Sequence, residues 1–366
     1  MNTNMNESTK DAAIKASAMS LLWSLGYVVR PEVMLSEPRQ RTVAHNAKYM
    51  DLTDIDVIGY QFGPLLRMDR IAVDCGSGKK RAAMERVFWM RGLMEAVGLS
   101  HGICVIGHNT EYEHRVASEK LSVTLISKDE FQALQIELLN RTQPTDLSQY
   151  YFENSSWLAW LNSQQSPFAS FILRDNWVRD WDRLPVSLAA QVRRWEVRLR
   201  PERPEHLFCF FELAILLSIA LVRMASYLLY TRPSDLPDAT YRYVLGGDKR
   251  VGLLRSIMHK MSAINGTTDV DSGSADREPM SLTVPYFAEL LDLTDRLMSR
   301  AGASRHVPRY LQAMQIARIA GSVEDFPRVL GSTPDQYSTK LALDVMRYLR
   351  VAGECNPDLL VGLAAI

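Results

Sequence analysis

Two apolar segments that each carry aspartates constrain the fold of this 366-residue chain most. Residues 53–60 read TDIDVIGY, and residues 70–75 read RIAVDC. Side chains alternate between the two faces of an extended strand, so Asp54 and Asp56 share one face. Carboxylates on paired strands offer the hard oxygen ligands that Mg²⁺ or Mn²⁺ prefers. We therefore expect Asp56 and Asp74 to form half of a metal site.

Apolar residues at helical spacing alternate with short β-rich runs over the first 140 residues. This order predicts an α/β (α+β) domain over residues 1–140, with a mixed sheet flanked by helices. Helices are expected at residues 11–25, 82–97, 111–120 and 128–139, and strands at 53–60, 70–75, 102–107 and 123–126. Residues 27–35 are a β-rich run that we expect to be bent or bulged at Pro31.

The pattern changes beyond residue 141, where strand signals are absent and helical spacing prevails. Five of the seven tryptophans lie within residues 157–195, and we expect them to pack in a core. The polar run TTDVDSGSADRE at residues 267–278 predicts a flexible loop. Residues 141–366 are thus expected to form a mostly α-helical domain that recognises a substrate or partner.

The apolar segment at residues 207–230, LFCFFELAILLSIALVRMASYLLY, is long enough to span a bilayer. Glu212 and Arg223 interrupt it and, eleven residues apart, fall on nearly the same helical face. A central core helix with one polar stripe has this pattern, so we favour a buried helix over a membrane span. The four scattered cysteines and the polar amino-terminal segment predict a cytoplasmic protein.

The balance of 42 basic and 42 acidic residues excludes a global field that attracts nucleic acid. Binding to nucleic acid would have to come from a local patch. Arg193, Arg194, Arg198 and Arg200, interleaved with Trp195, are the candidates for phosphate contacts. The alternative for this run is an ordinary solvated helix face.

The order of elements, the TDIDV strand, the VDC strand with its SGK exit and the ERVFWMRG helix at residues 85–92 together resemble the PD-(D/E)xK nuclease superfamily, whose fold is restriction-endonuclease-like. The resemblance covers about the first 140 residues and implies a mixed four-stranded sheet with flanking helices. It implies that Asp56 and Asp74 bind Mg²⁺ or Mn²⁺ and that the protein hydrolyses phosphodiester bonds of DNA or RNA. Many members of the superfamily act in bacterial phage defence.

One motif position departs from this superfamily. This chain has Gly76 at the position of the superfamily's catalytic lysine. The nearest candidates to supply that cation are Lys79 and Lys80, in the glycine-rich segment after the strand. Arg86 on the following helix either faces the substrate or is a surface charge. Two hypotheses remain open: a metal-dependent nuclease with a relocated lysine, and a catalytically degenerate scaffold or nucleic-acid-binding subunit of a larger complex.

Overall fold

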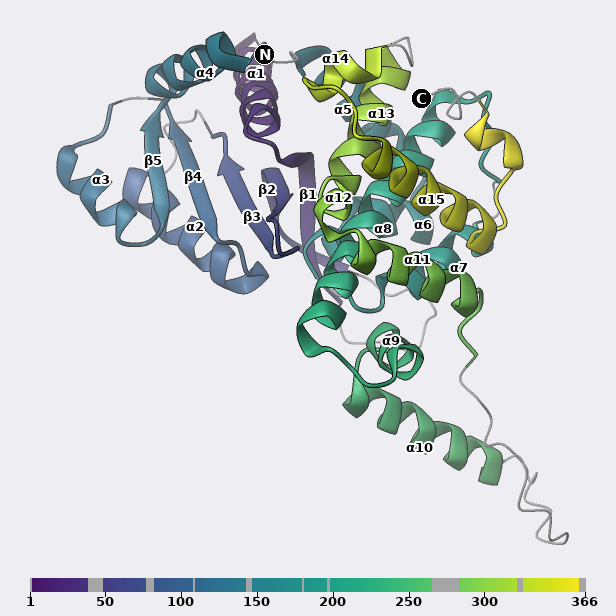
Figure 1. The fold of residues 1–366 in the computed structure, drawn as a ribbon. Coiled ribbons are helices and arrows are strands. Elements are labelled where there is room, and N and C mark those ends of the chain that lie inside the picture. The colour runs from purple at the N-terminus through teal and green to yellow at the C-terminus, as the bar shows by residue number, and fades with distance from the viewer. Residues whose placement is uncertain are drawn as a thin grey trace, which may run out of the picture.

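A five-stranded sheet flanked by helices forms the amino-terminal part of the chain, and helices alone form the rest (Figure 1). The computed structural model describes residues 2–38, 49–76, 82–107, 109–142, 147–179, 181–195, 198–264, 283–320 and 325–361. The expected mixed α/β architecture with a helical carboxyl-terminal part is confirmed. The expected loop at 267–278 lies outside the described residues.

The sheet has the strand order β1-β2-β3-β4-β5. β2 is antiparallel to both β1 and β3, whereas β4 and β5 run parallel to β3, so the expected mixed sheet is confirmed. The expected number of four strands was wrong, because β1 pairs with β2 along its whole length despite Pro31. The strands are β1 (Val28–Pro38), β2 (Tyr49–Phe62), β3 (Met68–Asp74), β4 (His101–Ile106) and β5 (Val123–Ser127).

Small residues allow helices to pack closely on both faces of the sheet. A Cβ on Gly102 of β4 would lie 2.4 Å from Cγ of Met90 on α2, so glycine leaves the space that this methionine fills. Gly59 of β2 in turn accommodates Leu22 of α1. The register and the alternation of side chains put α1 and α2 on opposite faces. The helices of this part are α1 (Asn2–Ser24), α2 (Ala83–Val97), α3 (Tyr112–Glu119) and α4 (Lys128–Thr142).

The long helix α8 (Pro204–Thr231) lies at the centre of the helical part, where α7, α11, α13 and α15 pack against it. Among the described residues, α8 is the one helix that is long enough and apolar enough to cross a membrane. In its most apolar 18-residue stretch, 89% is buried inside the protein. Such burial supports the expected core helix. The other helices are α5 (Ser148–Ser163), α6 (Pro167–Leu173), α7 (Leu184–Arg194), α9 (Leu236–Val244), α10 (Asp248–Ile264), α11 (Phe287–Ser299), α12 (Ala301–Ser304), α13 (Val307–Ala320), α14 (Phe326–Leu330) and α15 (Gln336–Ala352).

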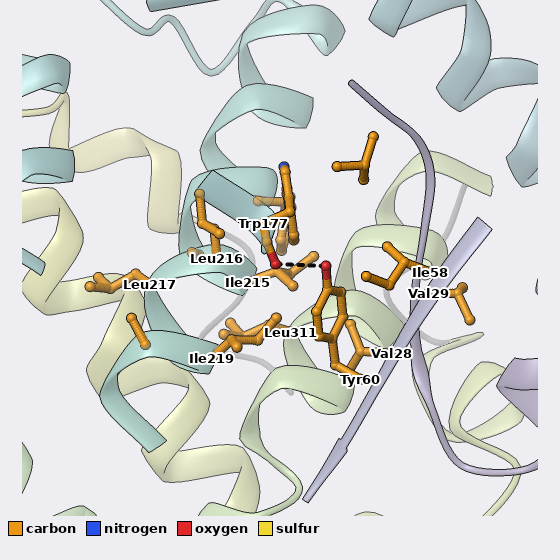
Figure 2. Packing of buried hydrophobic residues seen from close by; sticks show 14 of the residues in the cluster. Val28, Val29, Ile58, Tyr60, Trp177, Ile215, Leu216, Leu217, Ile219 and Leu311 are labelled. Carbon is orange, nitrogen blue, oxygen red and sulfur yellow. Dashed lines mark hydrogen bonds between the residues drawn. The ribbon is translucent and has the colours of Figure 1, made fainter. Parts of the chain in front are cut away.

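Strand β1 is the part of the sheet nearest to the helical part (Figure 1). The side-chain amide of Gln312 on α13 donates to the carbonyl of Val29 and accepts from its N–H at 2.8 Å. The hydroxyl of Tyr60 on β2 donates to the carbonyl of Trp177 at 2.8 Å, within a cluster that Figure 2 shows. The sheet and the helices therefore share one hydrophobic core, and a domain boundary at residue 140 stays a prediction.

Candidate functional site

The structure brings Asp56 and Asp74 together at the end of two paired strands. Val57 of β2 pairs with Val73 of β3, and the same register continued by one residue sets Asp56 opposite Asp74. The ladder ends there, and the N–H of Cys75 donates to Oδ2 of Asp56 at 2.7 Å. The carboxylate of Asp56 thus satisfies the first backbone donor beyond the ladder.

A lysine from helix α1 neutralises Asp56. Nζ of Lys15 lies 2.9 Å from Oδ1 of Asp56 and 2.6 Å from Oε1 of Glu32 on β1. Burial alone would lower the pKa of Lys15, but the two carboxylates together raise it above its ordinary value, so the ammonium stays charged. Sequence reasoning missed this lysine. Its signal is its place on the apolar stripe of α1, three and seven residues before the buried Ala18 and Leu22.

An arginine from helix α2 holds Asp74. Nε and Nη2 of Arg86 both lie 2.7 Å from Oδ2 of Asp74, and Nη2 also donates to the Asp74 carbonyl at 3.2 Å. Burial raises the pKa of Asp74, and the guanidinium opposes that rise. Arg86 is 5% exposed, so the interpretation as a surface charge was wrong.

Gly76, at the position of the motif lysine, makes room for this guanidinium. Its carbonyl accepts a hydrogen bond from Nη1 of Arg86, and a Cβ on Gly76 would lie 3.1 Å from Nη2. A lysine at this position would therefore push against Arg86. The positive charge beside Asp74 comes from α2 in this chain, while Lys79 and Lys80 lie outside the described residues.

The donor set of this acid pair does not fit a divalent metal ion as it stands. Both oxygens of Asp56 are engaged, by Lys15 and by the Cys75 N–H, and Oδ2 of Asp74 is engaged by Arg86. Within the described ranges, no group of three or more His, Cys, Asp or Glu side chains is placed to hold a metal. A metal ion that bridges both acids would therefore have to share these oxygens with Lys15 and Arg86 or displace one of them.

A groove lies at the Glu32 edge of the acid cluster. Glu32 lines a groove of about 610 Å³ between β1 and helices α5 and α6, together with Tyr151, Asn162 and Arg174. Neither Asp56 nor Asp74 lines it. A ligand in this groove would therefore contact Glu32 and not the acid pair itself.

The four arginines expected to contact nucleic acid do not form one helix face. Arg193 and Arg194 end α7, and Nη1 of Arg193 donates to the Ala352 carbonyl at 2.9 Å. Arg198 and Arg200 are exposed in the segment that leads to α8. The four arginines thus lie on two different segments, and their contact with nucleic acid stays a prediction.

Comparison with protein-family models, characterised proteins and solved structures finds no match to this chain. The fold and the site define the class as a mixed α/β protein with an attached helical bundle and an ion-paired acid pair at the strand ends. The resemblance to the PD-(D/E)xK superfamily rests on the residues and on the order of elements.

Proposed function

We propose that this chain is a nuclease-like scaffold that has lost hydrolysis and serves as a cytoplasmic, nucleic-acid-binding subunit of a larger complex, by superfamily analogy in phage defence. The observation that carries the proposal is the pairing of Asp74 with Arg86 in the space left by Gly76. A divalent cation needs carboxylate oxygens that are free to coordinate it. In this chain the Arg86 guanidinium occupies the Asp74 carboxylate in place of a metal ion.

The proposal assigns a structural role to both acids. Lys15 ties α1 to β2 through Asp56, and Arg86 ties α2 to β3 through Asp74. Removing one partner of a buried ion pair leaves an uncompensated charge and costs about 3–5 kcal/mol. The acid pair would then stabilise the junction between the sheet and its two covering helices.

The test compares Asp74→Asn with Asp54→Asn, an exposed aspartate of the same sheet. We expect the wild type to cut neither DNA nor RNA with Mg²⁺ or Mn²⁺. Urea denaturation should show Asp74→Asn less stable by about 3 kcal/mol, because Arg86 loses its partner, and Asp54→Asn nearly unchanged. Cleavage by the wild type that is lost in a folded Asp74→Asn variant would refute the scaffold proposal.

A second experiment tests whether a lysine at position 76 restores metal binding. Gly76→Lys alone should destabilise the fold, because its side chain meets Arg86. Gly76→Lys combined with Arg86→Ala removes that conflict and restores the motif lysine. Tighter Mn²⁺ binding by the double variant than by the wild type, measured by calorimetry, is the expected result. Equal, tight binding by both proteins would mean that Arg86 does not block the metal.

Metal-dependent phosphodiester hydrolysis is the second candidate function, and the position of Lys15 favours it. Its ammonium lies 2.9 Å from Asp56, so a lysine from α1 accompanies the acid pair although the motif position is empty. Under this hypothesis Asp56 and Asp74 are the metal ligands and Lys15→Gln abolishes cleavage. Under the scaffold proposal Lys15→Gln changes stability alone.

A further inference from the structure

A cleft rich in arginine separates the start of β3 from helices α8 and α9. It measures about 700 Å³, which is within the size range of small-ligand sites. The turn after β2 and the end of α2 form one wall, and α8 with the end of α9 forms the other. β3 is seven residues long, so its two ends, and with them the cleft and the acid pair, are about 20 Å apart.

The lining of this cleft carries a strong excess of positive charge. Its side chains include four arginines (Arg67, Arg70, Arg91 and Arg223) and a single acidic residue, Glu95. Arg91 pairs with Glu95 at 3.5 Å, but in the described part of the chain no carboxylate pairs with the other three arginines. The protein as a whole has zero formal charge, so this excess is local.

Two of these arginines, Arg70 and Arg223, line the cleft with like charges. Arg70 is half-buried, and Nη1 donates to the Val178 carbonyl at 3.3 Å. Burial lowers the pKa of Arg70, and the nearby charge of Arg223 lowers it further. An anion between the two guanidinium groups would relieve this repulsion.

Aromatic rings complete the lining. Tyr227 and Tyr230 on α8 are each 50% exposed, and Tyr243 on α9 has its ring centroid 5.1 Å from that of Tyr227. The guanidinium of Arg67 lies 5.5 Å from the centroid of the Tyr230 ring. Exposed rings beside arginines provide stacking surfaces for bases next to partners for phosphates.

We propose that this cleft binds nucleotides, with the arginines on the phosphates and the tyrosines against the base. The ligand is a nucleotide unit, whether a free nucleotide or part of a single strand, because a concave, ring-lined site reads an unpaired base. The proposal deepens the proposed function and rests on it for the nucleic-acid class. It does not depend on the acid pair, which lies at the other end of β3.

The test measures binding of a labelled single-stranded oligonucleotide of about 10 nucleotides by fluorescence anisotropy. Arg67→Gln with Arg91→Gln changes two exposed residues, so this variant should fold. Arg70→Gln with Arg223→Gln changes the half-buried pair. We expect each double variant to bind at least about tenfold more weakly than the wild type. The slope of log K against log salt concentration should become shallower by about 0.7 for each phosphate that a variant no longer neutralises.

Arg255→Gln with Arg318→Gln is the matched control, because it removes two exposed arginines outside the cleft. We expect it to leave the affinity within about twofold. If a nucleoside monophosphate competes with the oligonucleotide, the ligand is the free nucleotide. If it does not compete, the ligand is a single strand. Unchanged binding by both cleft variants, or an equal loss of binding in the control, would refute the proposal that this cleft is the binding site. The proposed function would not be affected by that result. No binding of either ligand by the wild type would refute both.

Discussion

Arg30 on β1 and Glu212 on α8 form an ion pair of 2.6 Å in which each side chain is 2% exposed. Nε2 of Gln315 donates to the second Glu212 oxygen at 2.9 Å, and the Arg30 guanidinium lies 4.9 Å from the centroid of the Trp177 ring. Glu212, which interrupts the apolar segment at 207–230, therefore joins the central helix to the sheet through this ion pair. Its pairing explains how α8 tolerates a carboxylate among apolar neighbours.

This pair predicts a large difference between single and double substitutions. Glu212→Leu leaves the Arg30 charge buried without its partner and should lower the free energy of unfolding by about 3–5 kcal/mol. Arg30→Met combined with Glu212→Leu removes both charges and should be close to the wild type in stability. Urea denaturation of the three proteins measures both values. Equal losses in the single and double variants would show that the charges do not act as a pair.

Helix α15 should depend on its N-cap. The side chain of Asp335 accepts from the N–H of Ser338 at 2.7 Å, so Asp335→Ala should cost about 1 kcal/mol in thermal or urea unfolding. Asp325 occupies the N-cap of α14 without a side-chain cap hydrogen bond and gives the matched control. Asp325→Ala should cost only a few tenths of a kcal/mol. A comparable loss in both variants would contradict the capping role.

Glu130 should titrate far below an ordinary glutamate. Hydrogen bonds from Arg115 at 2.7 and 2.9 Å, and from the hydroxyl and N–H of Ser127, lower its pKa from 4.5 to about 2. A depressed folded pKa stabilises the protein above pH 4.5 and loses that effect as the pH falls towards 2. Carbon NMR of the carboxyl should show this midpoint.

Arg115→Gln should move the Glu130 midpoint back towards 4.5, since Arg115 is the main cause of the shift. The pair is largely exposed, so the loss of stability near pH 7 should not exceed about 1 kcal/mol. It should vanish in acid, where Glu130 is protonated in both states. A midpoint that stays near 2 in the variant would assign the shift to Ser127 instead.

The burial of α8 predicts how the protein fractionates. Neighbouring helices cover 89% of its apolar window, so little apolar surface is left to contact lipid. The full chain, expressed in bacteria, should appear in the soluble fraction without detergent. Recovery in the membrane fraction, resistant to washing with high salt, would instead favour the membrane span.

Periodicity alone predicted most of the fold. The helices α2 and α4 and the acid-bearing strands β2 and β3 appear at the expected positions. The strand ladder was harder to foresee. Residues 36–38 and 49–52 are polar or mixed, yet they extend β1 and β2, because pairing between strands depends on register and not on local composition.

The candidate site could be predicted only in its acidic half. Asp56 and Asp74 stand out because they interrupt apolar strands, and the structure places them opposite each other. The cations that neutralise them come from separate helices, Lys15 41 residues before Asp56 and Arg86 twelve residues after Asp74. The apolar stripe of α1 indicates that Lys15 faces the core. Its partner, and that of Arg86, depend on how α1 and α2 lie against the sheet.

The contact between Gln312 and Val29 has a consequence for assembly. An unpaired N–H and C=O along the last strand of a sheet invite another extended chain to add to it. Gln312 occupies both groups of Val29, and the helical part covers this side of the sheet. A partner strand is therefore blocked from the sheet at Val29, whereas β5 forms the opposite margin of the sheet.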